Sequence, residues 1–91
     1  MSSELSSKSI NEISGEELLS FLQALWNKQL KLESVGVEDD FMTLGGQSVD
    51  MFRMLVTIED SLDAEIDFDD FFENTKLSVL HGLLLSLKTN N

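Results

Sequence analysis

Apolar residues recur at helical spacing in three stretches of this chain. The first stretch follows Ser14-Gly15-Glu16-Glu17, which has the sequence of a capping box, and its apolar residues then continue three and four positions apart. We therefore predict a helix that begins at Ser14 and ends near Lys31. The last stretch predicts a helix that approaches Lys88, and its spacing is marked by Leu77, Leu80, Leu84 and Leu87.

The middle stretch begins at Ser48 and has apolar residues on two sides. The wider side, which we expect to face the core, consists of Met51, Met54, Leu55, Ile58 and Leu62. A second set, called here the apolar stripe, consists of Val49, Phe52 and Val56 and lies roughly 130° around the helix from the first. Two interpretations stay open. Either the preceding loop covers the apolar stripe, or the stripe is exposed and docks a partner within an acidic rim.

Helical periodicity is lost from Leu32 to Gln47, so this segment is predicted to be a long loop. Loops of that length are uncommon in compact domains unless they have a function. Its apolar residues can hold it against the helices, and they are Val35, Val37, Phe41, Met42 and Leu44. We therefore expect an ordered and functional loop.

A run of alternating acids and phenylalanines, residues 67–73, predicts a short helix or turn that inserts aromatic side chains into the core. A calcium-binding loop would need an oxygen ligand and a glycine where Phe71 and Phe72 stand, so we expect no metal site. With three main helices, one short helix and no strand-like alternation, the predicted fold is an all-α four-helix bundle. We assign residues 1–13 to a flexible lead-in, residues 14–88 to the folded domain and residues 89–91 to a tail.

Composition narrows the classes of function. The 91 residues include 17 acidic and six basic side chains, a net charge of −11. This charge opposes binding to nucleic acids and anionic membranes and favours partners with basic surfaces. The absence of cysteine excludes disulfides, zinc–thiolate sites and a reactive thiol of the chain's own. Since no secretory signal or membrane-spanning segment is present, we expect a cytoplasmic protein.

Ser48 is the strongest candidate for chemistry. The unpaired N–H groups and the dipole at a helix start would favour a phosphate ester on its Oγ, and Gly45 and Gly46 can adopt positive φ and leave room for a modifying enzyme. A simpler interpretation is that Ser48 only caps the helix. Nucleophilic catalysis is disfavoured because the only histidine, His81, lies in the last helix and nothing in the sequence brings it to Ser48.

The run from Val37 to Ser48, with Asp40-Phe41-Met42 ahead of Leu44-Gly45-Gly46-Gln47-Ser48, resembles the signature of phosphopantetheine-dependent carrier proteins. The resemblance is to thiolation domains, the peptidyl and aryl carriers of nonribosomal peptide synthesis. It extends over roughly residues 15 to 88, through Ile66, Phe71-Phe72-Glu73 and the leucine-rich last helix. The expected architecture is therefore the carrier-protein bundle, with a long loop before its second helix.

The resemblance implies a covalent cofactor and a set of partner enzymes. A phosphopantetheinyl transferase would attach 4′-phosphopantetheine from coenzyme A to Ser48, with Gly46 and Gln47 beside the attachment point. An adenylating enzyme would load an amino or aryl acid as a thioester, and tailoring or condensing enzymes would receive it. The carrier itself would catalyse nothing. Docking would use the loop, with Phe41 and Met42, and the second helix, where the apolar stripe lies.

Two positions depart from the family's pattern. Gln47 stands where peptidyl carriers commonly have histidine or aspartate, and Thr75 stands where many members have proline before the last helix. We expect a stand-alone monomer that begins at Met1. Two other functions stay open. One is an acyl carrier protein of a fatty-acid or polyketide pathway, which would bind acyl chains within the bundle. The other is an unmodified acidic helical adaptor.

Overall fold

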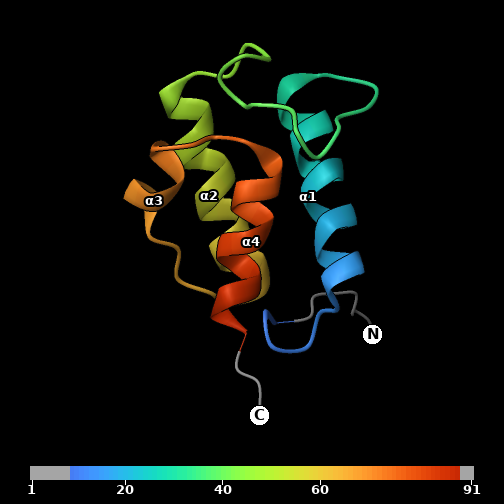
Figure 1. The fold of residues 1–91 in the computed structure, drawn as a ribbon, viewed down its shortest axis with the longest axis vertical. Coiled ribbons are helices and arrows are strands. Elements are labelled where there is room, and N and C mark those ends of the chain that lie inside the picture. Colours follow the sequence, from blue (N-terminus) through green and yellow to red (C-terminus); the bar gives the residue numbers. More distant parts are fainter. Residues whose placement is uncertain (1–8, 89–91) are drawn as a thin grey trace.

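The computed structural model describes residues 9–88, and all of its regular structure is helical. Its elements are α1 (Gly15–Leu30), α2 (Ser48–Leu62), α3 (Phe68–Phe72) and α4 (Leu77–Leu87). The three longer helices form the bundle and the short α3 lies beside α4 (Figure 1). Within the described range only an isolated bridge between Asp40 and Lys76 has β geometry, and no helix is both long and apolar enough to cross a membrane. The predicted all-α fold is confirmed.

The ends of α1 are set by local sequence, as predicted. The Glu17 N–H donates to Ser14 Oγ at 3.0 Å, and the Ser14 N–H donates to Glu17 Oε1 at 3.3 Å, which completes the capping box. At the other end Lys31 adopts the left-handed conformation, with φ of 58°, and its N–H donates to the Asn27 carbonyl. The helix therefore begins and ends where its capping residues stand.

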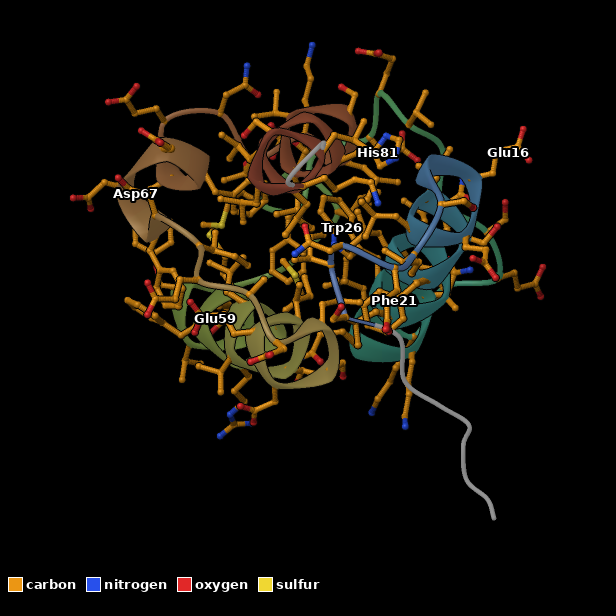
Figure 2. The ribbon with its side chains drawn as sticks, turned by 90° about the horizontal axis from the view of Figure 1, so that it is seen from below. Glu16, Phe21, Trp26, Glu59, Asp67 and His81 are labelled. Atoms are coloured by element: carbon orange, nitrogen blue, oxygen red, sulfur yellow. The ribbon has the colours of Figure 1, made fainter. Side chains whose placement is uncertain are left out.

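Aromatic rings from three different segments meet in the centre of the core. Trp26 of α1 lies 5.1 Å from Phe41 of the loop and 6.4 Å from Phe71 of α3, measured between ring centroids, and both pairs have an edge-to-face arrangement. Figure 2 shows Trp26 between the helices. The face of α2 predicted to be buried is buried, and it packs against this cluster with Met51, Met54, Leu55, Ile58 and Leu62.

Residues 9–13 are packed against the bundle, so the prediction of a flexible lead-in up to residue 13 is wrong for this segment. Ile10 and Ile13 are buried, and the Ile10 N–H donates to the Leu62 carbonyl at 2.7 Å. Lys88 Nζ donates to the carbonyls of Ile10 and Ile13. The folded part therefore begins before Ser14. The remainder of the predicted lead-in, residues 1–8, and the predicted tail, residues 89–91, lie outside the described residues.

The two ends of the bundle are formed by different segments of the chain. Residues 9–13 and the last turn of α4 lie at the lower end in Figure 1, and the long loop and the first turn of α2 lie at the upper end. The Ser48 end is therefore built from the loop, α2 and the segment that joins α3 to α4.

Candidate functional site

Ser48 is the first residue of α2, and its side chain is exposed. The interpretation of Ser48 as the helix cap is wrong, because Gln47 occupies the N-cap position and its N–H donates to Asp50 Oδ2 at 3.2 Å. Within residues 9–88 the Ser48 hydroxyl makes no hydrogen bond.

The two glycines before Ser48 are needed for different reasons. Gly45 has φ of +105°, a conformation that side-chain-bearing residues rarely adopt. Gly46 does not use the positive φ that glycine can adopt, but a Cβ at this position would lie 2.4 Å from Phe41 Cε2 and 2.9 Å from the Phe41 carbonyl oxygen. The Gly46 N–H also donates to that carbonyl at 3.0 Å. Gly46 is required because the backbone passes directly over the Phe41 ring.

Asp40 organises the loop through one carboxylate oxygen. Its Oδ1 accepts hydrogen bonds from Thr75 Oγ1 at 2.6 Å, from the Met42 N–H at 3.0 Å and from the Thr43 N–H at 3.3 Å. The Thr75 bond is the largest influence on the pKa of Asp40, which lies below its ordinary value of 3.8 although partial burial opposes the shift. Asp40 is therefore a carboxylate at neutral pH.

Backbone hydrogen bonds join the same loop to the start of α4. The Phe41 N–H donates to the Thr75 carbonyl at 2.9 Å, the Leu77 N–H to the Asp39 carbonyl at 2.9 Å, and the Ser78 N–H to the Val37 carbonyl at 2.8 Å. The last two bonds satisfy N–H groups of the first turn of α4, which have no partner within the helix. The loop is ordered, as predicted, because it provides the cap of another helix.

A surface depression of about 300 Å³ opens beside Ser48, between the loop, α2 and the segment that joins α3 to α4. Its apolar lining comes from Met42, Met51 and Phe72, and its polar lining includes Asp40, Asn74 and Thr75. Asn74 belongs to no motif in the sequence, and Thr75 stands out there only as a departure from the family's pattern. No motif joins residues 40 and 75, so only the fold could show that they are neighbours.

The apolar stripe is exposed, so the interpretation that the loop covers it is wrong. The exposed fractions are 52% for Val49, 44% for Phe52 and 48% for Val56. The Phe52 ring contacts two rings of α3, with centroids 5.4 Å from Phe68 and 5.3 Å from Phe72. A second, wider depression of about 580 Å³ runs along the stripe, and Gln29, Arg53 and Thr57 complete its lining.

The two loop residues predicted to dock partners differ in exposure. Met42 is 44% exposed, on the same end of the molecule as Ser48. Phe41 is completely buried against Trp26, so the prediction that its side chain docks a partner is wrong.

His81 lies on α4 with Nε2 2.9 Å from the Gly15 carbonyl oxygen of α1 (Figure 2), and it does not contact Ser48. In the described range, no cluster of three acidic or histidine side chains is arranged to hold a metal ion.

A small helical bundle that offers an unpaired serine hydroxyl at a helix start, directly after two structurally required glycines, has the architecture of a carrier domain. The comparison with known families agrees. The chain belongs to the family defined by the phosphopantetheine attachment site, whose profile matches residues 20–84. The resemblance noted in the sequence is therefore confirmed.

Relatives and similar folds come from nonribosomal peptide synthesis. The chain is 37% identical over 71 residues to nonribosomal peptide synthetase ecdA of Aspergillus rugulosus, and 34% identical over 68 residues to the probable synthetase CymA of Salinispora arenicola. Each match covers 75% of this chain and 1% of the synthetase. BlmI, a type-II acyl-carrier-protein from Streptomyces verticillus involved in bleomycin biosynthesis, has a TM-score of 0.68 and 26% identity, over 75% of this chain and 82% of BlmI.

A nonribosomal PCP domain is also similar, with a TM-score of 0.62 and 25% identity over 78% of this chain and 88% of the domain. The protein is therefore a carrier of the nonribosomal peptide synthetase type, in a family whose covalent cofactor is 4′-phosphopantetheine. The residues present fit that group, because an exposed hydroxyl without a partner stands beside an open depression with both apolar and polar walls.

Proposed function

We propose that Ser48 is the residue esterified by 4′-phosphopantetheine and that the protein acts in the cytoplasm as a stand-alone, monomeric peptidyl or aryl carrier. The observation that supports this proposal is the exposed Ser48 hydroxyl, which has no partner in residues 9–88 and stands at the start of α2. In the transfer, a bond forms between Ser48 Oγ and phosphorus. The pyrophosphate bond of coenzyme A breaks, and its nucleotide part leaves. The hydroxyl proton passes to a base of the transferase.

The start of α2 suits the phosphodiester that this reaction leaves. The first intrahelical bond runs from the Met51 N–H to the Gln47 carbonyl at 2.9 Å, so the N–H groups of Ser48 and Val49 precede it. Together with the helix dipole, these groups favour the negative charge of a phosphodiester attached to Ser48 Oγ. The bound group supplies a thiol, which a chain without cysteine lacks. An amino or aryl acid is then held on that thiol as a thioester.

The surface around Ser48 supports docking of several enzymes in turn. Met42 and the apolar stripe are exposed close to the attachment point, Glu59 and Asp60 follow on the same helix, and Asp63 is its C-cap. The net charge of −11 favours partner surfaces that are basic. We infer that the transferase, an adenylating enzyme and downstream tailoring or condensing enzymes share this surface.

An acyl carrier of a fatty-acid or polyketide pathway is less compatible with the core. Such a carrier was expected to bind acyl chains within the bundle, but Trp26, Phe41 and Phe71 fill its centre with interlocking rings. This packing favours a short amino or aryl acid that stays outside the core. The function of an unmodified adaptor would not require an unpaired hydroxyl at Ser48.

The test is the intact mass of the protein after incubation with coenzyme A, magnesium and a phosphopantetheinyl transferase of broad specificity. The wild type is expected to gain one phosphopantetheinyl group and Ser48→Ala none. Ser61→Ala, which changes a serine at the other end of α2, is the matched control and is expected to behave as the wild type. Failure of the wild type to gain mass, with a transferase that modifies another carrier in the same assay, would contradict the proposal.

A further inference from the structure

Thr75 holds two consecutive residues of the loop that leads to Ser48. It lies in the segment between α3 and α4, and only 6% of it is exposed. Its hydroxyl donates to Asp40 Oδ1 at 2.6 Å, and its carbonyl accepts the Phe41 N–H at 2.9 Å. The hydroxyl bond joins residues 35 positions apart in the sequence. A hydrogen bond to a carboxylate belongs to the stronger class, so this contact is a firm link between the two segments.

The contacts continue from Asp40 and Phe41 to the residues just before Ser48. Asp40 Oδ1 also accepts the N–H groups of Met42 and Thr43 and so forms the turn that follows it. The Phe41 carbonyl accepts the Gly46 N–H, and the Phe41 ring lies directly beneath Gly46. Gly46 is two residues from Ser48. The Thr75 hydroxyl is therefore connected to the start of α2 through Asp40, the adjacent Phe41 and Gly46, partly by these contacts and partly by the chain itself.

We propose that Thr75 is a positioning residue for Ser48: its hydroxyl, acting through Asp40, fixes the loop that presents the Ser48 hydroxyl to the modifying transferase. This inference rests on the proposed function. Without the Thr75 hydroxyl, Asp40 loses its shortest hydrogen bond, and the turn at Met42 and Thr43 loses its side-chain link to the segment before α4, while the backbone hydrogen bonds between the loop and that segment remain. The core contacts of Phe41 remain, so the domain stays folded while the loop becomes more mobile.

The experiment compares Thr75→Val, which keeps the shape of the side chain but removes the donor, with Thr75→Ser, which restores a hydroxyl. Thr43→Val makes the same chemical change at an exposed position of the same loop, where only the backbone N–H is used, and is the matched control. Two quantities are measured: amide hydrogen exchange by NMR on the unmodified protein, and the steady-state kinetics of phosphopantetheine transfer.

In Thr75→Val we expect faster exchange at the amides of Met42, Thr43 and Gly46, with unchanged exchange at buried α1 positions such as Leu22. The kcat for transfer is expected to fall roughly tenfold, the size typical of losing a hydrogen bond to a charged group, while KM stays within about twofold. KM is preserved because the apolar stripe is unaltered. Thr75→Ser is expected to recover most of both effects, and Thr43→Val to show neither. A residue with only a structural role would not separate kcat from KM in this way.

Asp40→Asn is a second variant, for the case that Thr75→Val does not fold. It keeps an acceptor oxygen but removes the charge, so a smaller change in the same direction is expected in both measurements. If both measurements stay at wild-type values in the folded variants while the wild type is modified, the positioning role is overturned and the proposed function stands. If the wild type itself is not modified, the proposed function is wrong, and so is the proposed role of Thr75 in the transfer. The exchange data then show separately whether Thr75 orders the loop.

Discussion

Single atoms decide the geometry around Ser48. The absence of one Cβ at Gly46 lets the backbone cross the Phe41 ring, and one carboxylate oxygen of Asp40 accepts three hydrogen bonds. Both hold the loop that leads to Ser48, so the position of the Ser48 hydroxyl depends on residues that precede it in the chain.

Gly46→Ala is expected to destabilise the protein by about 1–3 kcal/mol, because the added methyl would overlap the Phe41 ring and the Phe41 backbone. Gly82→Ala is the matched control. A Cβ at Gly82 would have no atom within 4 Å, and alanine in a helix interior is favoured over glycine by about 0.5–1 kcal/mol. Urea unfolding measures both changes. Equal stability of the two variants would show that the contact with Phe41 can relax.

Asp40 is expected to make stability depend on pH in the acid range. Its pKa is lowered in the folded protein, chiefly by the Thr75 hydrogen bond, so its contribution is fully present above the ordinary value of 3.8. The contribution is lost as the pH falls through the lower, folded-state value. The difference in unfolding free energy between wild type and Asp40→Asn should therefore be larger at pH 6 than at pH 3. A constant difference would mean that the charge of Asp40 has no part in stability.

At the scale of elements, local patterns predicted the helices well and the loop poorly. Helical spacing was sufficient to identify the buried face of α2, and the capping box located the start of α1. The loop has no periodicity, so no pattern could show that Phe41 points into the core while Met42 points out. The link between Asp40 and Thr75 depends on how α4 returns past the loop, which is a property of the tertiary fold.

The sequence pattern also failed to predict that two isoleucines before α1 are packed against the bundle. Ile10 and Ile13 are too few to reveal a periodic pattern, yet both are buried and their carbonyls accept hydrogen bonds from Lys88.

In the candidate site, the sequence correctly predicted the helix start at Ser48 and the order of the preceding loop. It could not predict that Gln47 is the cap, since serine is by far the commoner capping residue.

On α2, a substitution in the apolar stripe is expected to weaken the binding of partner enzymes. Val56→Thr keeps the branched shape of an exposed side chain on α2 and replaces one methyl group by a hydroxyl, so the free energy of unfolding should change by less than about 0.5 kcal/mol. If the stripe docks the transferase, KM for transfer should rise roughly fivefold with little change in kcat. An unchanged KM would place docking elsewhere.

The whole molecule carries a large excess of negative charge, and self-repulsion opposes its compact state. Among the described residues, Lys76 and Glu38 form an ion pair at 3.6 Å, and both side chains are largely exposed. An exposed pair of this kind offsets little of a net charge of −11.

Salt is therefore expected to stabilise the fold. Raising sodium chloride from about 0.01 M to about 1 M shortens the screening length from about 30 Å to about 3 Å, so repulsion between surface carboxylates is largely removed. The melting temperature, followed by circular dichroism, should rise by several degrees. A fall in Tm with salt would mean that attractive ion pairs outweigh the repulsion.

The positions of the first and last described residues have a mechanical consequence. The segment before α1 and the last turn of α4 both lie at the end of the bundle away from the first turn of α2 (Figure 1). A tether attached to either of these two segments would therefore start from the side opposite the Ser48 face. The domain could then be anchored through either side of its sequence, to a bead or to another domain, with the Ser48 face turned away from the anchor.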